Sequence, residues 1–122
     1  MREDCIFDIR SITKPVTALA ALVLVDRKRL DLDAPITDSL PEARSSKWAH
    51  NVSLRHLLTH TSGLGQEGLK GLDGLTESRG VPLPDVARAV LEMPLSGKTG
   101  GPWRYSSPGY CLAGRLIEVA AQ

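Results

Sequence analysis

The sequence predicts a mainly α-helical fold. Three segments, residues 12–29, 84–93 and 108–121, are dense in apolar residues at helical spacing. The segments between them are rich in glycine and proline, and the strict alternation of apolar and polar residues that marks a strand is almost absent. With 122 residues and no internal repeat or linker, we expect residues 1–122 to form a single unit.

Composition and charge argue against several classes of partner. The chain has 15 Lys and Arg against 14 Asp and Glu, a net charge of +1, and no basic run that would favour nucleic acid or a membrane surface. The longest apolar run, Pro15 to Val25, is too short to span a bilayer. Because the start is polar, from Met1 to Asp4, we expect no signal peptide and a cytoplasmic chain as it stands; the native compartment stays open.

The cysteines, Cys5 and Cys111, are far apart and form neither a scaffold nor a metal-binding spacing. We expect two free thiols rather than a disulfide. Cys5 begins a short segment, Cys5 to Arg10, that is expected to be extended. Cys111 is expected to pack within the last helix.

The first helix is expected from Ile12 to about Arg29. Its apolar residues lie almost all round the helix, which predicts burial on every side. Pro15 falls in the first turn, where a missing N–H has no cost. The cations at its end, Arg27 to Arg29, suit the negative end of the helix dipole.

Shorter elements are expected in the middle of the chain. Residues 37–40 form one helical turn that Pro41 stops, and residues 42–51 are loop-like with Trp48 as an anchor. Ser53 caps a helix over residues 54–59, and Gly63 takes a left-handed turn after it. Residues 65–80 hold five glycines and predict a loop with at most one helical turn, either bordering a substrate pocket or simply disordered.

Two amphipathic helices complete the prediction, over residues 84–93 and about 108–121. The loop between them covers residues 94–102, and residues 103–105 are expected to be briefly extended. Several of the helices are apolar on more than one side. Because buried faces need partners, a lone chain of this kind is expected to expose apolar surface.

The pattern that carries chemistry is Ser11-Ile12-Thr13-Lys14, at the start of the first helix. Positions i and i+3 share a helix face, so the amine of Lys14 can approach the hydroxyl of Ser11. A serine is a weak nucleophile until a base takes its proton, and a lysine removed from water can be that base. A capping serine beside a solvated lysine is the plainer interpretation of the same residues.

His56 and His60 lie four residues apart and are expected to share one helix face, a spacing that metal ligands can use. No glutamate follows His56 and no third ligand is apparent in the sequence. We therefore expect structural roles for both histidines, no metal and no cofactor.

Three segments together resemble the serine β-lactamase and penicillin-binding-protein superfamily, above all class C β-lactamases, D-alanyl-D-alanine carboxypeptidases and family VIII carboxylesterases. They are Phe7–Pro15, Val52–Leu64 and Pro102–Tyr110. The middle segment is very specific to that group, and the resemblance extends from about Phe7 to Ala121. It implies that the chain is the helical region of a β-lactamase-like α+β fold, with most or all of the antiparallel sheet missing.

The resemblance also implies roles for four residues. Ser11 is similar to the acylated nucleophile, whose backbone N–H supplies half of an oxyanion hole, and Lys14 is similar to its general base. Tyr105 is similar to the tyrosine that faces the nucleophile and shuttles a proton. Ser107 stands where the family usually has an asparagine that contacts the substrate amide. Serine still donates and accepts a hydrogen bond, and this departure leans towards an esterase-like member. Apart from the resemblance, Trp103 is expected either to pack against its neighbours or to line the substrate cleft.

The third motif of the family, K-T-G or a histidine variant, lies on a strand that follows the tyrosine motif. Lys98-Thr99-Gly100 has the same letters, but it precedes Tyr105 in a glycine-rich loop. We interpret this match as coincidence and expect the third motif beyond Gln122.

Two functions are consistent with this sequence. The first is a serine hydrolase that acts by acyl transfer through Ser11 on a small-molecule ester or amide, of the esterase, β-lactam or D-Ala-D-Ala peptide type. The second is a non-catalytic helical fragment of such a hydrolase, which folds alone or self-associates into a homo-oligomer through exposed apolar helix faces. The sequence leaves open which of the two applies.

Overall fold

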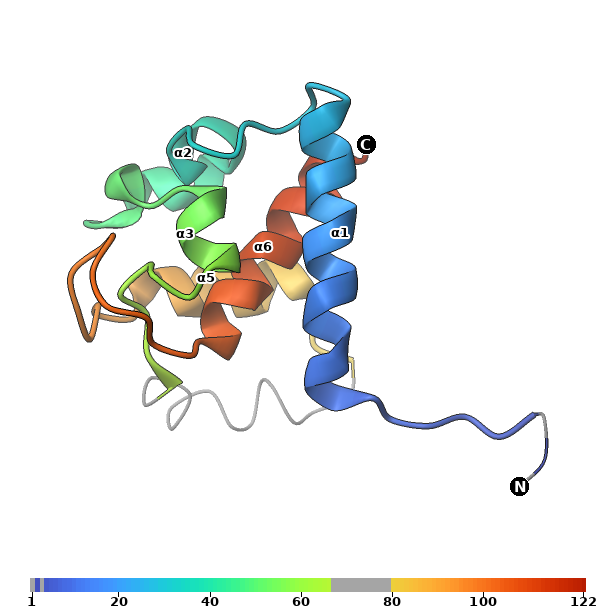
Figure 1. The fold of residues 1–122 in the computed structure, drawn as a ribbon. Coiled ribbons are helices and arrows are strands. Elements are labelled where there is room, and N and C mark those ends of the chain that lie inside the picture. The colour runs from blue at the N-terminus through green and yellow to red at the C-terminus, as the bar shows by residue number, and fades with distance from the viewer. Residues whose placement is uncertain (1, 3, 67–79) are drawn as a thin grey trace.

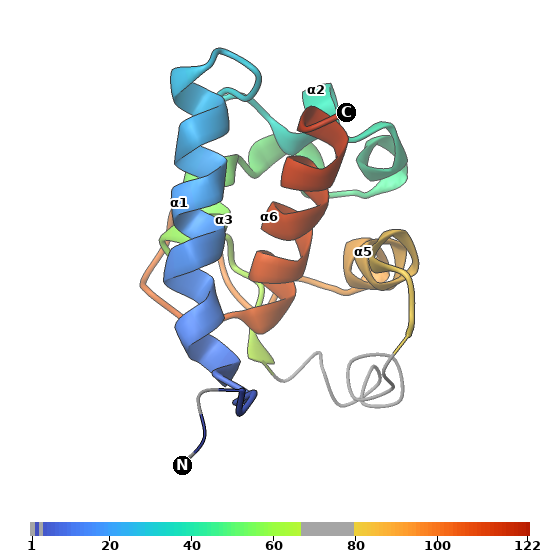
Figure 2. The ribbon, with the colours of Figure 1, turned by 90° about the vertical axis from the view of Figure 1, so that its right-hand side faces the viewer.

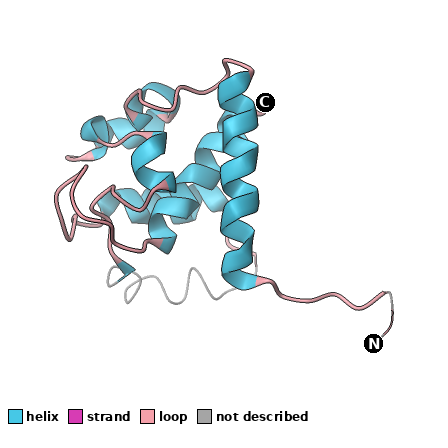
Figure 3. Cartoon of the chain, viewed as in Figure 1, coloured by secondary structure: helices cyan, strands magenta, loops and turns pink. Residues whose placement is uncertain are grey.

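The computed structural model describes residues 2, 4–66 and 80–122, and within them it contains helices and loops but no strand (Figure 3). The prediction of a mainly α fold is therefore confirmed. The helices, including the short 3-10 turns η1 to η3, are η1 (Arg10–Ile12), α1 (Thr13–Asp26), α2 (Ile36–Ser39), η2 (Pro41–Ser45), η3 (Ala49–Asn51), α3 (Leu54–Leu58), α5 (Leu83–Glu92) and α6 (Ser107–Ala120).

Helix α6 is the centre of the arrangement, because it packs against α1, α5, α3 and α2. Helices α1 and α6 lie side by side and run in the same direction (Figures 1 and 2). Their N-terminal ends therefore lie at the same end of the molecule. The described residues before η1 extend away from the body (Figure 1).

The hydrophobic core lies around α6 and is built from aliphatic side chains, as the low aromatic content requires. Fully buried leucines come from α3 (Leu57), from α6 (Leu112) and from the loop after α3 (Leu64). From α5 the core takes the face that carries Val86 and Val90. Burial of each such side chain stabilises the fold by about 1.5–3 kcal/mol relative to an exposed position.

The prediction that α1 is buried all round is wrong. Only Ala21 and Leu24 of this helix are buried, whereas Val16 and Leu19 are 61% and 64% exposed. The physical reason is that α1 contacts the body along one side, against α6, while its apolar residues cover more than one side (Figure 2). The sequence pattern describes how much apolar surface the helix has, but not whether a neighbour covers it.

Helix α1 also ends three residues earlier than predicted. Lys28 adopts a left-handed conformation with φ of 57°, and the N–H of Arg29 donates to the carbonyl oxygen of Leu24 at 2.8 Å. This reversal satisfies a carbonyl at the helix end and turns the chain back. It brings Leu30 into the core.

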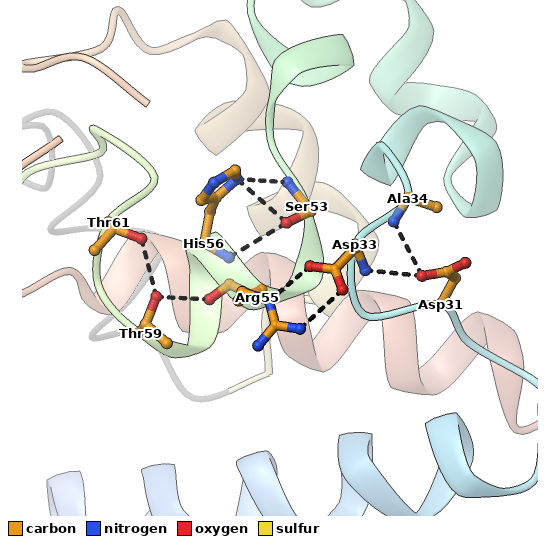
Figure 4. A network of polar contacts seen from close by, with 8 residues as sticks. All are labelled: Asp31, Asp33, Ala34, Ser53, Arg55, His56, Thr59 and Thr61. Atoms are coloured by element: carbon orange, nitrogen blue, oxygen red, sulfur yellow. Dashed lines mark hydrogen bonds and ion pairs between the residues drawn. The ribbon is translucent and has the colours of Figure 1, made fainter. Parts of the chain in front are cut away.

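The N-terminal end of α3 is capped as predicted. The Ser53 hydroxyl accepts a hydrogen bond from the N–H of His56, and the N–H of Ser53 donates to His56 Nδ1 at 3.1 Å (Figure 4). The pair forms a capping box in which a histidine takes the place of the usual glutamate. Two backbone donors at this helix end, the N–H groups of Ser53 and His56, thereby find partners.

The connector after α1 is fastened to α3 by polar contacts (Figure 4). The guanidinium of Arg55 pairs with both carboxylate oxygens of Asp33, at 2.6 and 2.8 Å, and the backbone N–H of Arg55 donates to the Leu32 carbonyl at 2.9 Å. The Asp31 carboxylate accepts from the backbone N–H groups of Asp33 and Ala34. The Arg55–Asp33 ion pair is exposed, and water weakens an exposed ion pair. The backbone hydrogen bonds of the turn therefore hold the connector as much as the ion pair does.

The remaining segments differ in detail from the prediction. Residues 42–51, expected as loop, contain η2 and η3, since Pro41 is well suited to the first position of a helical turn. Trp48 is the predicted anchor, because its Nε1 donates to the Met93 carbonyl at 2.8 Å. The segment from Cys5 to Arg10 forms no strand. Most of the predicted loop over residues 65–80 lies outside the described residues.

Two other predictions concern the whole chain. Cys5 and Cys111 are both free thiols, as expected. Among the helices that the structure describes, none is long and apolar enough to cross a membrane.

Gly63 occupies the left-handed turn predicted after α3, with φ of 86°. Its carbonyl accepts hydrogen bonds from the N–H groups of Ser96 and Gly97, at 2.9 and 3.1 Å. A Cβ at position 63 would collide with the Gly97 carbonyl. Close by, the Thr99 hydroxyl donates to the Ser62 carbonyl at 3.1 Å and the N–H of Gly100 donates to Thr61 at 2.8 Å. Lys98-Thr99-Gly100 thus belongs to a loop fastened to the turn after α3.

We predict that Gly63→Ala lowers the free energy of unfolding by about 2 kcal/mol or more, because it combines a left-handed backbone with a backbone clash. Gly97→Ala is the matched control in the same pair of loops, since a Cβ there meets no atom. Urea denaturation followed by circular dichroism measures both variants. Equal stabilities for the two variants would contradict the close approach at Gly63.

Candidate active site

The candidate site lies where the N-terminal ends of α1 and α6 meet. Ser11 is in the 3-10 turn η1, and Lys14 follows one turn later in α1. Tyr105 stands just before α6, whose start is held by the Ser106 hydroxyl, an acceptor for the N–H of Gly109 at 3.0 Å. The parallel packing of the two helices brings residues 94 positions apart into contact.

Ser11, Lys14 and Tyr105 form one hydrogen-bonded group. The Ser11 Oγ lies 2.7 Å from the Tyr105 hydroxyl oxygen, and Lys14 Nζ donates to the same Oγ at 3.2 Å. Lys14 Nζ also lies 4.8 Å from the centre of the Tyr105 ring and 5.7 Å from that of Tyr110. The serine hydroxyl therefore touches two groups able to exchange a proton with it.

The group is open to solvent on the side of Ser11. Ser11 is exposed, while Lys14 and Tyr105 are half-buried. A reactant can reach the hydroxyl from solvent while the two partners are held by their surroundings. This combination is what a nucleophile and its proton-transfer partners require.

Charge at the site favours ionisation of Tyr105. The hydrogen bond from Lys14, and next the one from Ser11, lower the pKa of Tyr105 below its usual value, against the opposing effect of burial. Burial instead raises the pKa of Tyr110. The N-terminal ends of two helices add partial positive charge at this end of the molecule. The first tyrosine to ionise is therefore the one that contacts Ser11.

The backbone directly before Ser11 is in an unusual conformation. Arg10 has φ of 46°, a left-handed value that non-glycine residues rarely adopt. Its N–H donates to the Asp8 carboxylate at 2.9 Å. The turn sets the direction in which the chain enters η1 and hence the position of Ser11.

Of the two predicted substrate-contacting residues, Trp103 lies in the same loop as Tyr105, and Ser107 is the first residue of α6. The N–H of Ser107 donates to the Gln66 side-chain oxygen at 2.6 Å, and the Ser107 hydroxyl contributes a small lowering of the pKa of Tyr105. Trp103 is 66% exposed and its ring meets His60 edge-on, with centres 5.6 Å apart. Trp103 and Ser107 therefore both lie beside Tyr105.

The prediction that His56 and His60 share a helix face is wrong. Helix α3 ends at Leu58, and His60 has φ of 59°, so it lies in the turn beyond the helix. His56 Nδ1 accepts from Ser53, whereas His60 Nδ1 accepts from the N–H of Ser106 at 3.1 Å. Within the described part of the chain, no three His, Cys, Asp or Glu side chains are grouped so that they could hold a metal ion.

Sequence reasoning missed two residues that surround the site, His60 and Tyr110. The rings of both lie beside the site, and Tyr110 donates its hydroxyl hydrogen to the Leu58 carbonyl at 2.9 Å. From the sequence, the position of each residue in its predicted segment suggested only a packing role. The signal that could have found His60 was its place in the specific middle segment, together with the turn that Gly63 predicts.

Comparison with known proteins agrees with this geometry. The whole chain, residues 1–122, matches the family model described as Beta-lactamase. The chain therefore belongs to the beta-lactamase family, within the serine β-lactamase and penicillin-binding-protein superfamily of serine hydrolase type.

Individual relatives carry different activities in their names. The chain is 45% identical to "Esterase EstB" of Burkholderia gladioli, with 98% of the chain and 33% of the relative covered. It is 34% identical to "Acyltransferase calJ" of Penicillium decumbens (86% and 29% covered) and 32% identical to "Protein flp" of Staphylococcus aureus (92% and 22%). The chain thus spans a third or less of the length of these relatives.

We predict that Tyr105 ionises at lower pH than Tyr110, and that Lys14→Met moves the pKa of Tyr105 back up towards the usual value of about 10. The cause is the loss of the ammonium that stabilises the phenolate. Ultraviolet absorbance of tyrosinate during a pH titration measures this, with Tyr105→Phe used to assign the first step. A first step that survives in Tyr105→Phe would contradict the prediction.

Proposed function

We propose that this chain carries the nucleophile and the base of a serine hydrolase that acts by acyl transfer, with Ser11, Lys14 and Tyr105 as its catalytic residues. The observation that supports this most is the contact of Ser11 Oγ with both Tyr105 and Lys14, at 2.7 and 3.2 Å. The second support is the family to which the chain belongs.

The proposed reaction has two halves. In the first, Lys14 acts with its amine unprotonated: Ser11 Oγ attacks the carbonyl carbon of the substrate, and the serine proton passes to that amine with Tyr105 as the relay. The same proton then goes to the leaving group as the bond to it breaks, leaving an acyl-serine. In the second, water attacks the acyl-serine, the acid is released, and Ser11 regains its hydrogen. The lowered pKa of Tyr105 helps the proton move between these groups.

The proposed substrate class is a small-molecule ester. This choice is supported by the relative named as an esterase, at 45% identity, and by Ser107 in place of the asparagine usual in the family. Ser107 and Trp103 are the proposed substrate contacts, one polar and one apolar. The relative named as an acyltransferase suggests that an acceptor other than water can also take the acyl group.

We predict that Ser11→Ala abolishes hydrolysis of p-nitrophenyl butyrate, and that Lys14→Met lowers it by about 10²–10⁴-fold, the usual contribution of a positioned base. Thr17→Ala is a control one turn along α1, because it removes only a hydroxyl that donates to the Thr13 carbonyl. Release of p-nitrophenol measures all variants, and nitrocefin tests β-lactam hydrolysis in the same way.

Covalent labelling separates a reactive serine from turnover. A fluorophosphonate should add one adduct to the chain, seen as a shift in intact mass, and Ser11→Ala should remove it. Hydrolysis and labelling that persist equally in Ser11→Ala would overturn the proposal.

The exposed face of α1 favours a second candidate function, in which residues 1–122 act as a single non-catalytic helical unit that self-associates. Val16, Leu19 and Val23 lie on one stripe at i, i+3 and i+7, and all three are exposed. Contiguous apolar surface of this kind typically marks an interaction site. A homo-oligomer would cover it without any change in the helix.

We predict that the chain forms concentration-dependent oligomers, and that Leu19→Glu with Val23→Glu shifts it to monomer because a charge on this stripe opposes its burial. Ser45→Glu with Gln122→Glu is the matched control, since both residues are exposed and neither belongs to the apolar stripe of α1. Size-exclusion chromatography with light scattering measures the mass. A wild-type monomer at every concentration rules out self-association.

A further inference from the structure

His60 occupies a central place beside the candidate site. Its ring centre lies 4.8 Å from that of Tyr105 and 5.1 Å from that of Tyr110, at tilts of 34° and 39°. Trp103 closes the group with an edge contact at 5.6 Å. The imidazole is therefore packed between the aromatic side chains that surround Lys14.

The same residue also bonds the backbone on both sides of Tyr105. The His60 carbonyl accepts from the N–H of Arg104 at 2.8 Å, and His60 Nδ1 accepts from the N–H of Ser106 at 3.1 Å. Because a backbone N–H can only donate, Nδ1 carries no hydrogen, and the neutral ring has its hydrogen on Nε2. One residue thus fixes the backbone before and after Tyr105.

We propose that His60 is a positioning residue for acyl transfer, which in its neutral form holds the Tyr105 hydroxyl against Ser11 and Lys14 and on protonation releases it. This inference rests on the proposed function of Ser11. It goes beyond that function, because it assigns to a histidine that contacts no reacting atom the control of the tyrosine geometry.

The surroundings of His60 favour the neutral ring. Burial, and then the positive charge of Lys14, lower the pKa of His60 below its usual 6.5. The titratable groups that face it are Lys14 from α1, Tyr105 from the preceding loop and Tyr110 from α6. Below their own pKa values the tyrosines are neutral, so a protonated imidazole would meet the lysine charge without compensation from them.

The direction of the pH effect follows. At pH above 6.5 the imidazole is neutral in both the folded and the unfolded chain, and the Ser106 bond is intact. As the pH falls through the lowered folded value, the ring gains a hydrogen at Nδ1. Two donors then face each other at the Ser106 bond, and the arrangement around Tyr105 is weakened. Since the unfolded chain binds this proton at higher pH, stability also declines below 6.5.

Two substitutions at position 60 test the role of the hydrogen-bond acceptor, because both remove the imidazole but only one keeps an acceptor. His60→Asn keeps an acceptor near the position of Nδ1 and cannot titrate in this range, whereas His60→Gly removes the acceptor. Asparagine and glycine both tolerate the left-handed φ of 59°, so backbone strain does not distinguish the variants. Circular dichroism checks that each variant folds.

The primary measurement is the rate of Ser11 labelling by a fluorophosphonate between pH 5 and 9, with the His60 and Ser106 signals followed by NMR in the same samples. We expect the wild-type rate to fall with a midpoint that matches the NMR titration of His60. His60→Asn should keep a rate near that of the wild type at neutral pH and lack that midpoint. His60→Gly should lose about 10²-fold, the effect of a catalytic group displaced by about 1 Å.

A wild-type rate in His60→Gly, or the same acid midpoint in His60→Asn, overturns the proposal. If His60→Gly does not fold, the comparison of His60→Asn with the wild type still decides it. If Ser11 reacts in no variant, the proposed function fails, and NMR decides the positioning role alone. The Tyr105 ring and Ser106 amide signals must then shift over the same pH range as the His60 titration. A Tyr105 signal that stays constant over that range overturns the inference.

Discussion

The parallel packing of α1 against α6 is the constraint on which the rest of the structure depends. It places two helix starts side by side, one with Ser11 and Lys14 and the other with Tyr105 just before it. Antiparallel packing would put the ends of these 14-residue helices about 20 Å apart. Helices α3 and α5 support α6 from its other sides, so the core that stabilises α6 also sets the position of Tyr105.

The two sides of α1 have different roles in this account. The inner side supplies Ala21 and Leu24 to the core, and the N-terminal turn supplies Lys14 to the site. The outer side, with Leu19 and its exposed neighbours, carries apolar surface that the described residues leave open to solvent. One helix therefore links the stability of the chain, its candidate site and its exposed apolar surface.

Local signals allowed most of the elements to be predicted from the sequence. Ser53 and Gly63 mark the start of α3 and the turn after it because capping and a left-handed turn are decided by a few neighbouring residues. The contact between Ser11 and Lys14 follows from helix geometry alone. The contact of Tyr105 with Ser11 came from the family resemblance, since no local rule joins residues 94 positions apart. The exposure of α1 and the place of His60 depend on tertiary neighbours, which periodicity does not reveal.

The most direct test of the central claim is to locate fluorophosphonate adducts by peptide mass mapping, once in buffer and once in concentrated urea. If the folded arrangement of α1 and α6 activates the nucleophile, the adduct forms on Ser11 in buffer and is absent in urea. Labelling of Ser11 at equal rates in both conditions, or labelling spread over several serines in buffer, would contradict the account.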